Sequence, residues 1–350
     1  MGILKKAAAA ILVACFAVAA LTSCHAQNEE VLDIAGTKIS SSFYLAALLS
    51  ADLEFQNEVS SSSSSASSNY KSQTLDDKPY ETWVKDTALS NLKKYVYLKD
   101  ELSKANVSFD DETRSNVEYA TNYYWNYYGY EKICKDNGIS EDDFSLNISV
   151  NYMSDMLFDY LYGEGGENEI DKDEVLKALD ENYILADVIN EDVSSASDDE
   201  KAEIKSKLEG YRDRLAAGES WDTILEEYNE ENGTSSTSTS SASDEEGPED
   251  KNAVVFGSEN TNSPSDYFDD LSTAEIGVPQ VMELDDYTVL ILRKDITADD
   301  YYYDNYGINA RYILKGDEFE STLDTESAKL EATELVNLDY YSPDKLVYDN

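Results

Sequence analysis

The pattern of hydrophobic and polar positions predicts that the first 180 residues are mostly helical. Apolar and aromatic residues return every three or four positions, which is typical of helices with one buried face. In 80–106, for example, Val84, Ala88, Leu92 and Leu102 lie near one face. The pattern predicts helices over 42–59, 80–106, 110–136, 140–163 and 171–182. In front of them, VLDIAGTKIS (31–40) predicts a short strand and a turn.

The segment 140–163 is the clearest of these helices. Apolar and aromatic residues recur in it every four positions, and Gly163 is its expected end. Ser140 followed by Asp143 predicts a capping box at its start. The recurring residues are Phe144, Ile148, Tyr152, Met156 and Tyr160.

The pattern changes after residue 182 to one that predicts a small α+β module. YILADVI (183–189), AVVFGS (253–258) and YTVLILR (287–293) predict strands. Helices are expected around Ile204–Leu215 and Trp221–Tyr228, with a short helical piece near 266–271. This mixture of strands and helices is typical of a compact α+β domain. In the tail (301–350) the pattern predicts one helix near 317–325 and an irregular end.

Two low-complexity segments interrupt these elements. Residues 60–68 are nearly all serine, and 233–252 consist mainly of Ser, Thr, Asp and Glu. Neither segment contains enough apolar residues to form a core, so both are predicted to be disordered loops.

The N-terminus has the form of a secretory signal peptide. Lys5 and Lys6 precede an apolar run over 7–21, which is too short to span a bilayer comfortably. LTSC (21–24) resembles the lipobox of bacterial lipoproteins, which implies cleavage before Cys24 and acylation of that residue. Two or three acyl chains would anchor the protein almost permanently, since each buried CH₂ contributes about 0.8 kcal/mol.

Composition excludes several kinds of chemistry. His25 is the only histidine and lies beside the lipid, so Ser-His and Cys-His nucleophilic sites, a histidine general base and histidine zinc ligation are all excluded. No metal or cofactor is therefore predicted. With Cys15 in the signal peptide and Cys24 acylated, Cys134 has no disulfide partner and is interpreted as a packed core residue.

The chain is strongly acidic, with a formal net charge of −46. Nucleic acid and anionic lipid headgroups are poor partners for such a surface, whereas cationic segments or divalent cations suit it. An acidic shell that keeps a secreted protein soluble explains the charge equally simply.

The order of the motifs resembles that of the PrsA-like extracellular foldase lipoproteins. VLDIAGTKIS is similar to the family's Val-x-x-Val-Asn-Gly-x-x-Ile-Ser start, and NGISEDDF (137–144) and YLYGEGGENEI (160–170) also resemble foldase segments. RLAAGESWDTILEEYNE (214–230) and SPSDYFDDLSTAEIGVPQV (263–281) followed by DYTVLIL resemble parvulin motifs. The resemblance implies a helical chaperone domain, built from both chain ends, that brackets a parvulin-type peptidyl-prolyl isomerase domain.

The departures from the family pattern fall on the isomerase site. Asp187 and Thr288 stand where the parvulin motifs have histidine. The family's Gly-Gly-x-Leu-Gly turn is replaced by the acidic serine loop, which leaves Val255-Phe256-Gly257 recognisable. The resemblance therefore predicts no confident catalytic residue, although an apolar pocket can favour the twisted amide without histidine. Such a pocket could be lined by Phe256, Tyr267, Phe268 and Tyr287; packing in the core of a small sheet is the alternative for each.

The aromatic run YYWNYYGY (123–130) is too widely spread around a helix to form one buried stripe. Rings with polar tips suit a surface that holds unfolded chains, and packing between two helices is the alternative. The candidates for client binding are Tyr123, Tyr124, Trp125, Tyr127 and Tyr128.

Together these observations predict an α+β protein: a signal peptide (1–23), a lipidated tether (24–30), a helical chaperone domain (31–182), a parvulin-like domain (183–296) and a C-terminal segment (297–350) that packs on the chaperone domain. The predicted function is that of a membrane-anchored extracytoplasmic foldase that assists exported proteins, with an inactive isomerase domain. Its partners would be unfolded exported proteins and the bilayer, not nucleic acid. An active parvulin and a solute-binding lipoprotein of a transporter are the alternatives.

Overall fold

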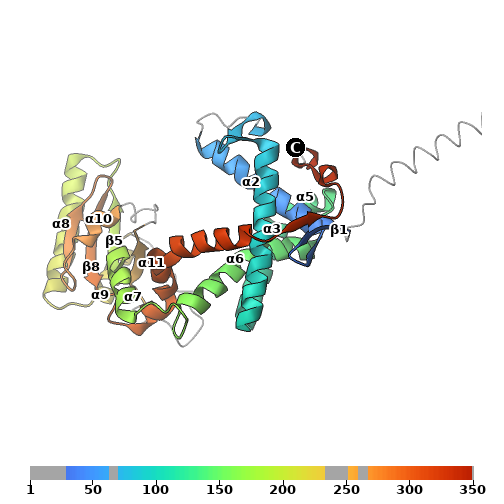
Figure 1. Ribbon diagram of the computed structural model, residues 1–350. Coiled ribbons are helices and arrows are strands. Elements are labelled where there is room, and N and C mark those ends of the chain that lie inside the picture. The colour runs from blue at the N-terminus through green and yellow to red at the C-terminus, as the bar shows by residue number, and fades with distance from the viewer. Residues whose placement is uncertain (1–28, 63–69, 233–250, 259–266, 349–350) are drawn as a thin grey trace, which may run out of the picture. The chain divides into compact units, whose positions relative to one another are not determined.

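A computed structural model describes residues 29–62, 70–232, 251–258 and 267–348 (Figure 1). Helices dominate, and the strands form small antiparallel sheets, which confirms the predicted mostly helical α+β class. Within these ranges no helix is both long and apolar enough to cross a bilayer. The predicted signal peptide, Cys24 and most of the tether lie outside the described residues, as do 63–69 and 233–250 of the two predicted loops.

Contacts between Cα atoms divide the chain into two units. Unit 1 comprises Met1–Leu161 and Asp317–Asn350, and unit 2 comprises Tyr162–Gly316. Unit 2 thus starts before, and ends after, the segment 183–296 that resembles a parvulin. The two boundaries fall inside long helices, α6 (Glu141–Tyr162) and α11 (Asp300–Ala328).

The first described element of unit 1 is a hairpin of β1 (Glu30–Ile34) and β2 (Thr37–Ser40), where the sequence predicts one short strand and a turn. Its turn holds Ala35 and Gly36 at φ of 47° and 90°, the left-handed backbone that two-residue hairpin turns require. The Gly36 amide donates to the Asp33 carboxylate over 2.8 Å. A third strand, β9 (Ala332–Glu334), comes from the far end of the chain and pairs antiparallel with β1.

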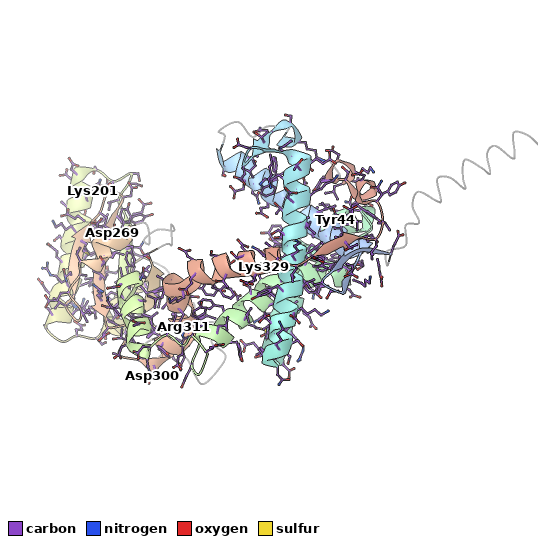
Figure 2. The ribbon with its side chains drawn as sticks, in the orientation of Figure 1. Tyr44, Lys201, Asp269, Asp300, Arg311 and Lys329 are labelled. Atoms are coloured by element: carbon purple, nitrogen blue, oxygen red, sulfur yellow. The ribbon has the colours of Figure 1, made fainter. Side chains whose placement is uncertain are left out.

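The core of unit 1 lies between helices α2 (Ser41–Ser62) and α3 (Tyr80–Ala105). Phe55 on α2 and Leu98 on α3 are buried, as is Tyr44 on α2, which Figure 2 labels. Residues 60–62 belong to α2, so the loop predicted over 60–68 starts too early, because a helix with a buried face carries its last turn into polar sequence. The connection between the helices holds η1 (Tyr70–Ser72), β3 (Thr74–Leu75) and β4 (Lys78–Pro79).

The single helix predicted over 110–136 is wrong. Asp110 caps α4 (Asp111–Asn122) by accepting from the Thr113 amide over 2.7 Å. The chain then widens into a π-helical turn, η2 (Tyr123–Tyr127), and breaks at Gly129, whose φ is 75°. A short helix, α5 (Tyr130–Asp136), follows. A left-handed glycine cannot continue a right-handed helix, which explains the break.

Helix α6 (Glu141–Tyr162) has the predicted extent. Its buried face, however, is not formed by the residues that recur every four positions from Phe144 to Tyr160. Each step of four residues advances the position by about 40° around an α-helix, so the stripe that starts at buried Phe144 reaches solvent at Tyr160. The capping box is half formed: Ser140 Oγ accepts from the Asp143 amide over 3.2 Å, whereas the Ser140 amide donates to Ser42 Oγ. The buried positions of α6 after Phe144 are Ser149, Met153, Leu157, Phe158 and Tyr162.

Unit 2 contains a four-stranded antiparallel sheet in the order β6-β5-β8-β7. The predicted strands are β5 (Tyr183–Asp192), β6 (Val254–Gly257) and β8 (Tyr287–Lys294); the edge strand β7 (Gln280–Glu283) was missed. The helices are α7 (Lys172–Asn182), α8 (Asp198–Ala216), α9 (Trp221–Asn232) and α10 (Phe268–Ser272). Ser197 and Glu200 form a complete capping box at the start of α8.

The helix predicted near 317–325 is much longer. Helix α11 starts at Asp300 and includes the whole tyrosine-rich segment that the sequence left irregular. Within unit 2 its first turns are held by an ion pair of 3.0 Å between Asp300 and Lys172, and by the Arg311 guanidinium, which donates to the Tyr303 hydroxyl over 2.8 Å (Figure 2). After β9, the chain ends in two 3₁₀ turns, η4 (Leu338–Tyr341) and η5 (Pro343–Lys345).

Candidate functional site

The sheet of unit 2 has two different faces, and the candidate isomerase residues are divided between them. On one face, Ile184 and Ala186 of β5 lie beside Val289 and Ile291 of β8 and pack against α10. On the other face, Ile189 and Leu290 pack against α8 and α9. Since side chains alternate along a strand, odd positions of β5 and even positions of β8 share this second face.

The four proline-pocket candidates are brought together on the α10 face. Phe256, Tyr267, Phe268 and Tyr287 belong to one apolar cluster around Leu271. The rings of Tyr267 and Tyr287 meet edge to face with centroids 5.7 Å apart. The Tyr267 hydroxyl accepts from the Asp286 amide over 3.3 Å. These contacts make the cluster a packed layer of the core.

Asp187 and Thr288 lie on the opposite face of the sheet from that cluster. They occupy an odd position of β5 and an even position of β8, and both are buried beneath the α8 side. Asp187 is only 1% exposed and forms an ion pair with Lys294 Nζ at 2.6 Å. Asp187 is thus neither solvated nor at the end of its strand, because β5 continues past it to Asp192. The sheet itself separates these two residues from the proposed pocket.

Cys134, the one cysteine within the described ranges, is buried. Burial raises the pKa of the Cys134 thiol to about 12, so the thiol stays protonated and unreactive. No group of three or more His, Cys, Asp or Glu side chains within these ranges is arranged to hold a metal ion.

The most unusual surface of unit 1 is formed by five exposed tyrosines on α4 and η2, which we call the tyrosine surface. Most apolar patches on soluble proteins are small, so a continuous group of exposed rings indicates a binding site. Their exposed fractions range from 38% to 76%. The members are Tyr119 (71%), Tyr123 (38%), Tyr124 (44%), Tyr127 (76%) and Tyr128 (58%).

The rings of the tyrosine surface stack on one another. Tyr123 lies between Tyr119 and Tyr127, with ring centroids 6.1 and 5.2 Å away and interplanar angles of 10° and 7°. Tyr124 and Tyr128 form a second stacked pair at 5.7 Å. Tyr128 also meets Tyr123 edge to face at 5.1 Å, which joins the two rows. The result is one continuous aromatic surface with hydroxyls along it.

The π-helical turn explains why the row stays straight. In an α-helix, residues four apart are offset by about 40° around the axis, so a row of three tyrosines would drift away from its face. In η2 the turn is wider, and the Tyr128 amide donates to the Tyr123 carbonyl five residues back over 3.2 Å. The wider turn offsets the drift and keeps Tyr127 over Tyr123. Such π turns occur frequently at functional sites.

Trp125 differs from the other predicted client-binding residues because it is buried. Only 4% of its surface is exposed, and its ring lies 5.4 Å from that of Phe144 on α6. Trp125 therefore fixes η2 onto α6 and turns the neighbouring tyrosines outward. The sequence reasoning missed Tyr119, which the four-residue spacing from Tyr123 could have indicated.

The charges around the tyrosine surface are mainly negative. Asp111, Glu112 and Glu118 are exposed on the same helix as Tyr119, and its one cation, Arg114, is paired with Asp111 at 2.7 Å. The nearest lysines, on α5, are engaged in ion pairs: Lys132 with Asp136 at 2.7 Å and Lys135 with Glu131 at 2.5 Å. The surface thus combines aromatic rings with an acidic surround, which favours segments that carry both apolar and basic side chains.

A second feature of unit 1 is a hollow of about 490 Å³ between α3, the following loop and α6, lined by both polar and apolar side chains. Methionine side chains, which adapt to irregular apolar partners, form part of its wall. On the same helix, the Tyr152 hydroxyl donates to the Asn116 carbonyl of α4 over 3.4 Å, which ties α6 to the helix that carries Tyr119. The lining includes Leu102, Phe109, Met153 and Met156.

Solved structures of foldase protein PrsA are similar to this chain. That from Streptococcus pneumoniae is 13% identical, with 73% of this chain and 90% of that chain covered and a TM-score of 0.38. That from Lactococcus lactis is 12% identical, with 86% and 91% covered and a TM-score of 0.36. That from Bacillus subtilis is 12% identical, with 71% and 84% covered and a TM-score of 0.32.

These structures come from the family that the sequence motifs indicated. No protein-family model matches the chain, and no curated protein matches it either. At this level of identity, the activity of the chain has to be inferred from its own side chains.

Proposed function

We propose that this protein is a lipid-anchored extracytoplasmic chaperone that holds unfolded exported polypeptides on the tyrosine surface. The observation that carries the proposal is the continuous stack of five exposed tyrosines, held outward by buried Trp125. Tyrosine offers a large apolar face together with a hydroxyl, so it can contact many different side chains and backbones. The acidic surround adds attraction for basic segments without restricting their sequence.

Removing rings from the tyrosine surface should weaken client binding and leave the fold intact. Buried aromatic contacts at interfaces commonly contribute about 2 kcal/mol or more, so Tyr127→Ser should weaken client binding at least tenfold. Tyr127 is among the most exposed residues of unit 1, and its replacement should change the free energy of unfolding by no more than about 1 kcal/mol, the value of its stacking contact.

The assay measures light scattering of a refolding client at increasing chaperone concentration. Tyr160→Ser is the matched control, since Tyr160 is also exposed, at 45%, but lies on α6 outside the tyrosine surface. Thermal unfolding by circular dichroism confirms that each variant is folded. If the variant Tyr123→Ser/Tyr127→Ser/Tyr128→Ser suppresses aggregation as well as the natural protein does, the tyrosine surface is not the client site.

For unit 2 we propose a peptide-binding or scaffolding role without isomerase activity. Asp187 and Thr288, at the positions of the family histidines, lie across the sheet from the apolar cluster. A protease-coupled assay on a proline tetrapeptide should therefore show the uncatalysed relaxation, which takes tens to hundreds of seconds.

An active isomerase is the second candidate, favoured by the clustering of Phe256, Tyr267 and Phe268. If the natural protein accelerates the relaxation as a parvulin does, and Phe256→Ala abolishes the acceleration without unfolding unit 2, this second function is correct.

A further inference from the structure

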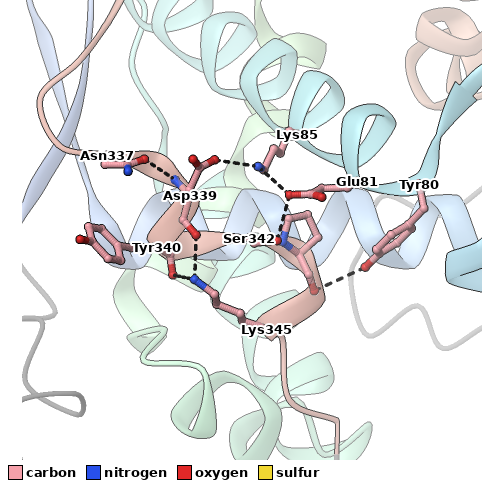
Figure 3. A network of polar contacts seen from close by, with 9 residues as sticks. Tyr80, Glu81, Lys85, Asn337, Asp339, Tyr340, Ser342 and Lys345 are labelled. Atoms are coloured by element: carbon pink, nitrogen blue, oxygen red, sulfur yellow. Dashed lines mark hydrogen bonds and ion pairs between the residues drawn. The ribbon is translucent and has the colours of Figure 1, made fainter.

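The last residues of unit 1 contact its helices as a bound peptide contacts a receptor. We define the tail as residues 338–348, which comprise η4, η5 and the chain that follows. Its backbone hydrogen bonds are local, from Tyr340 to Asn337, from Lys345 to Ser342 and from Leu346 to Pro343. Its attachment to α2, α3 and the end of α5 runs through side chains, and Figure 3 shows those on the α3 side.

Part of this attachment would accept a peptide of any sequence. The Asn137 side chain forms two hydrogen bonds with one residue of the tail: its amide donates to the Val347 carbonyl over 2.9 Å and its carbonyl accepts from the Val347 amide over 2.8 Å. The Lys71 ammonium donates to the Pro343 carbonyl over 3.4 Å. Such main-chain contacts are the usual source of sequence-tolerant affinity in peptide recognition.

The rest of the attachment depends on particular side chains. Tyr341, Pro343 and Leu346 are buried, and the ring of Tyr341 meets that of Tyr44 edge to face at 6.2 Å. The Tyr348 hydroxyl donates to the buried Asp52 carboxylate. These four anchors follow the spacing tyrosine-x-proline-x-x-leucine-x-tyrosine.

Polar contacts hold the tail from the α3 side. Lys85 on α3 lies 3.4 Å from Asp339 and 2.8 Å from Glu81, and Glu81 accepts from the Ser342 hydroxyl over 3.1 Å (Figure 3). Ion pairs of this exposed kind contribute little each, about 1 kcal/mol or less, so they can open without a large cost.

From these contacts we propose that the surface of α2, α3 and Asn137 is a peptide-binding groove, and that the tail occupies it as an intramolecular competitor. The external ligand is an unfolded polypeptide segment with aromatic, proline and aliphatic residues at the spacing of the tail. The inference goes beyond the proposed function, because the groove is separate from the tyrosine surface and would bind peptides even if that surface bound none.

The test exchanges the tail of the folded protein. A protease site is inserted between Val336 and Asn337, in an exposed connection, and the full chain is cut after purification. A fluorescent peptide with the sequence of 337–350 is then added, and its anisotropy is measured. The cut protein should bind the peptide saturably and keep its helical circular dichroism. The uncut protein should bind at least tenfold more weakly, because a tethered tail competes at an effective concentration in the millimolar range.

Matched variants locate the binding site. Asn137→Ala in the cut protein should weaken peptide binding several-fold, whereas Asn126→Ala, at an exposed asparagine of η2, should not. In the uncut chain, Leu346→Asp should loosen the tail and raise peptide binding, whereas Asp344→Ala, at an exposed position between the anchors, should leave it unchanged.

Two results would overturn the proposal. The first is a cut protein that stays folded but does not exchange its tail for the peptide. The second is a cut protein that loses its helical signal when the tail is washed away, which would make the tail part of the core of unit 1.

Discussion

Replacing Asp52 by asparagine is expected to lower the free energy of unfolding of unit 1 by about 2–3 kcal/mol. The Asp52 carboxylate is fully buried and accepts hydrogen bonds from the hydroxyls of Tyr70, Tyr80 and Tyr348. Each hydrogen bond to a charged group contributes about 1.5–3 kcal/mol. Asparagine keeps one oxygen as acceptor and replaces the other by an NH₂ group, so about one such bond is lost after the hydroxyls reorient.

The experiment compares thermal unfolding of Asp52→Asn and the natural protein by circular dichroism. For a unit of this size, about 1 kcal/mol corresponds to 2–4 °C, so a decrease of about 5–10 °C is expected. Asp86→Asn is the control, because Asp86 makes an exposed ion pair with Lys78 at 2.7 Å. Its replacement should change stability by less than about 1 kcal/mol. If both variants unfold at the same temperature, the buried carboxylate does not stabilise unit 1 as reasoned.

Three further predictions concern the turn between β1 and β2, the buried side chain of Tyr44 and the predicted lipid anchor at Cys24. Ala35→Asn should raise the free energy of unfolding by about 0.5–1 kcal/mol, because the left-handed backbone at this position costs alanine roughly 1–2 kcal/mol and asparagine less. Gly36→Ala should lower the free energy of unfolding, because Gly36 has a φ of 90°. Denaturant titrations measure both changes. Burial raises the pKa of Tyr44 to about 12. The contribution of neutral Tyr44 to the stability of unit 1 is therefore complete below about pH 10 and is lost as the pH rises through 12. Circular dichroism at alkaline pH should show this loss of stability, and a profile that stays flat would contradict the prediction. Cys24→Ala should move the protein from the membrane to the soluble fraction, and unchanged fractionation would refute the lipid anchor.

The order and type of most elements could be predicted because their hydrophobic periodicity is strong. Helices α2, α3, α6, α8 and α9 and strands β5, β6 and β8 lie where the periodicity indicated. The edge strand β7 was missed, because its four residues are only half-buried or exposed and show little alternation. The length of α11 was missed because tyrosine-rich sequence has no clear apolar stripe, although the helix is held by tertiary contacts such as the ion pair of Asp300 with Lys172 on α7.

Which side chains of the candidate sites are buried, and on which face of the sheet they lie, could not be predicted from the sequence. The aromatic run could be recognised as a surface from its spread around a helix, but the sequence could not indicate which ring is buried. Trp125 is turned inward by its contact with Phe144, which is 19 positions away along the chain. The position of Asp187 relative to the apolar cluster depends on strand register, and a shift of one residue exchanges the two faces of a sheet.

The pairing of β1 with β9 has a consequence for the order in which the chain folds, because a chain leaves the ribosome N-terminus first. Ile34 pairs with Ala332, so the two strands are about 300 residues apart, and closing such a loop costs about 5 kcal/mol of chain entropy before any contact is gained. Unit 2 is one continuous stretch of sequence and can be completed while the last part of the chain is still being synthesised. Unit 1, which carries the tyrosine surface, reaches its final form last, and every truncation before residue 332 leaves β1 without its partner β9.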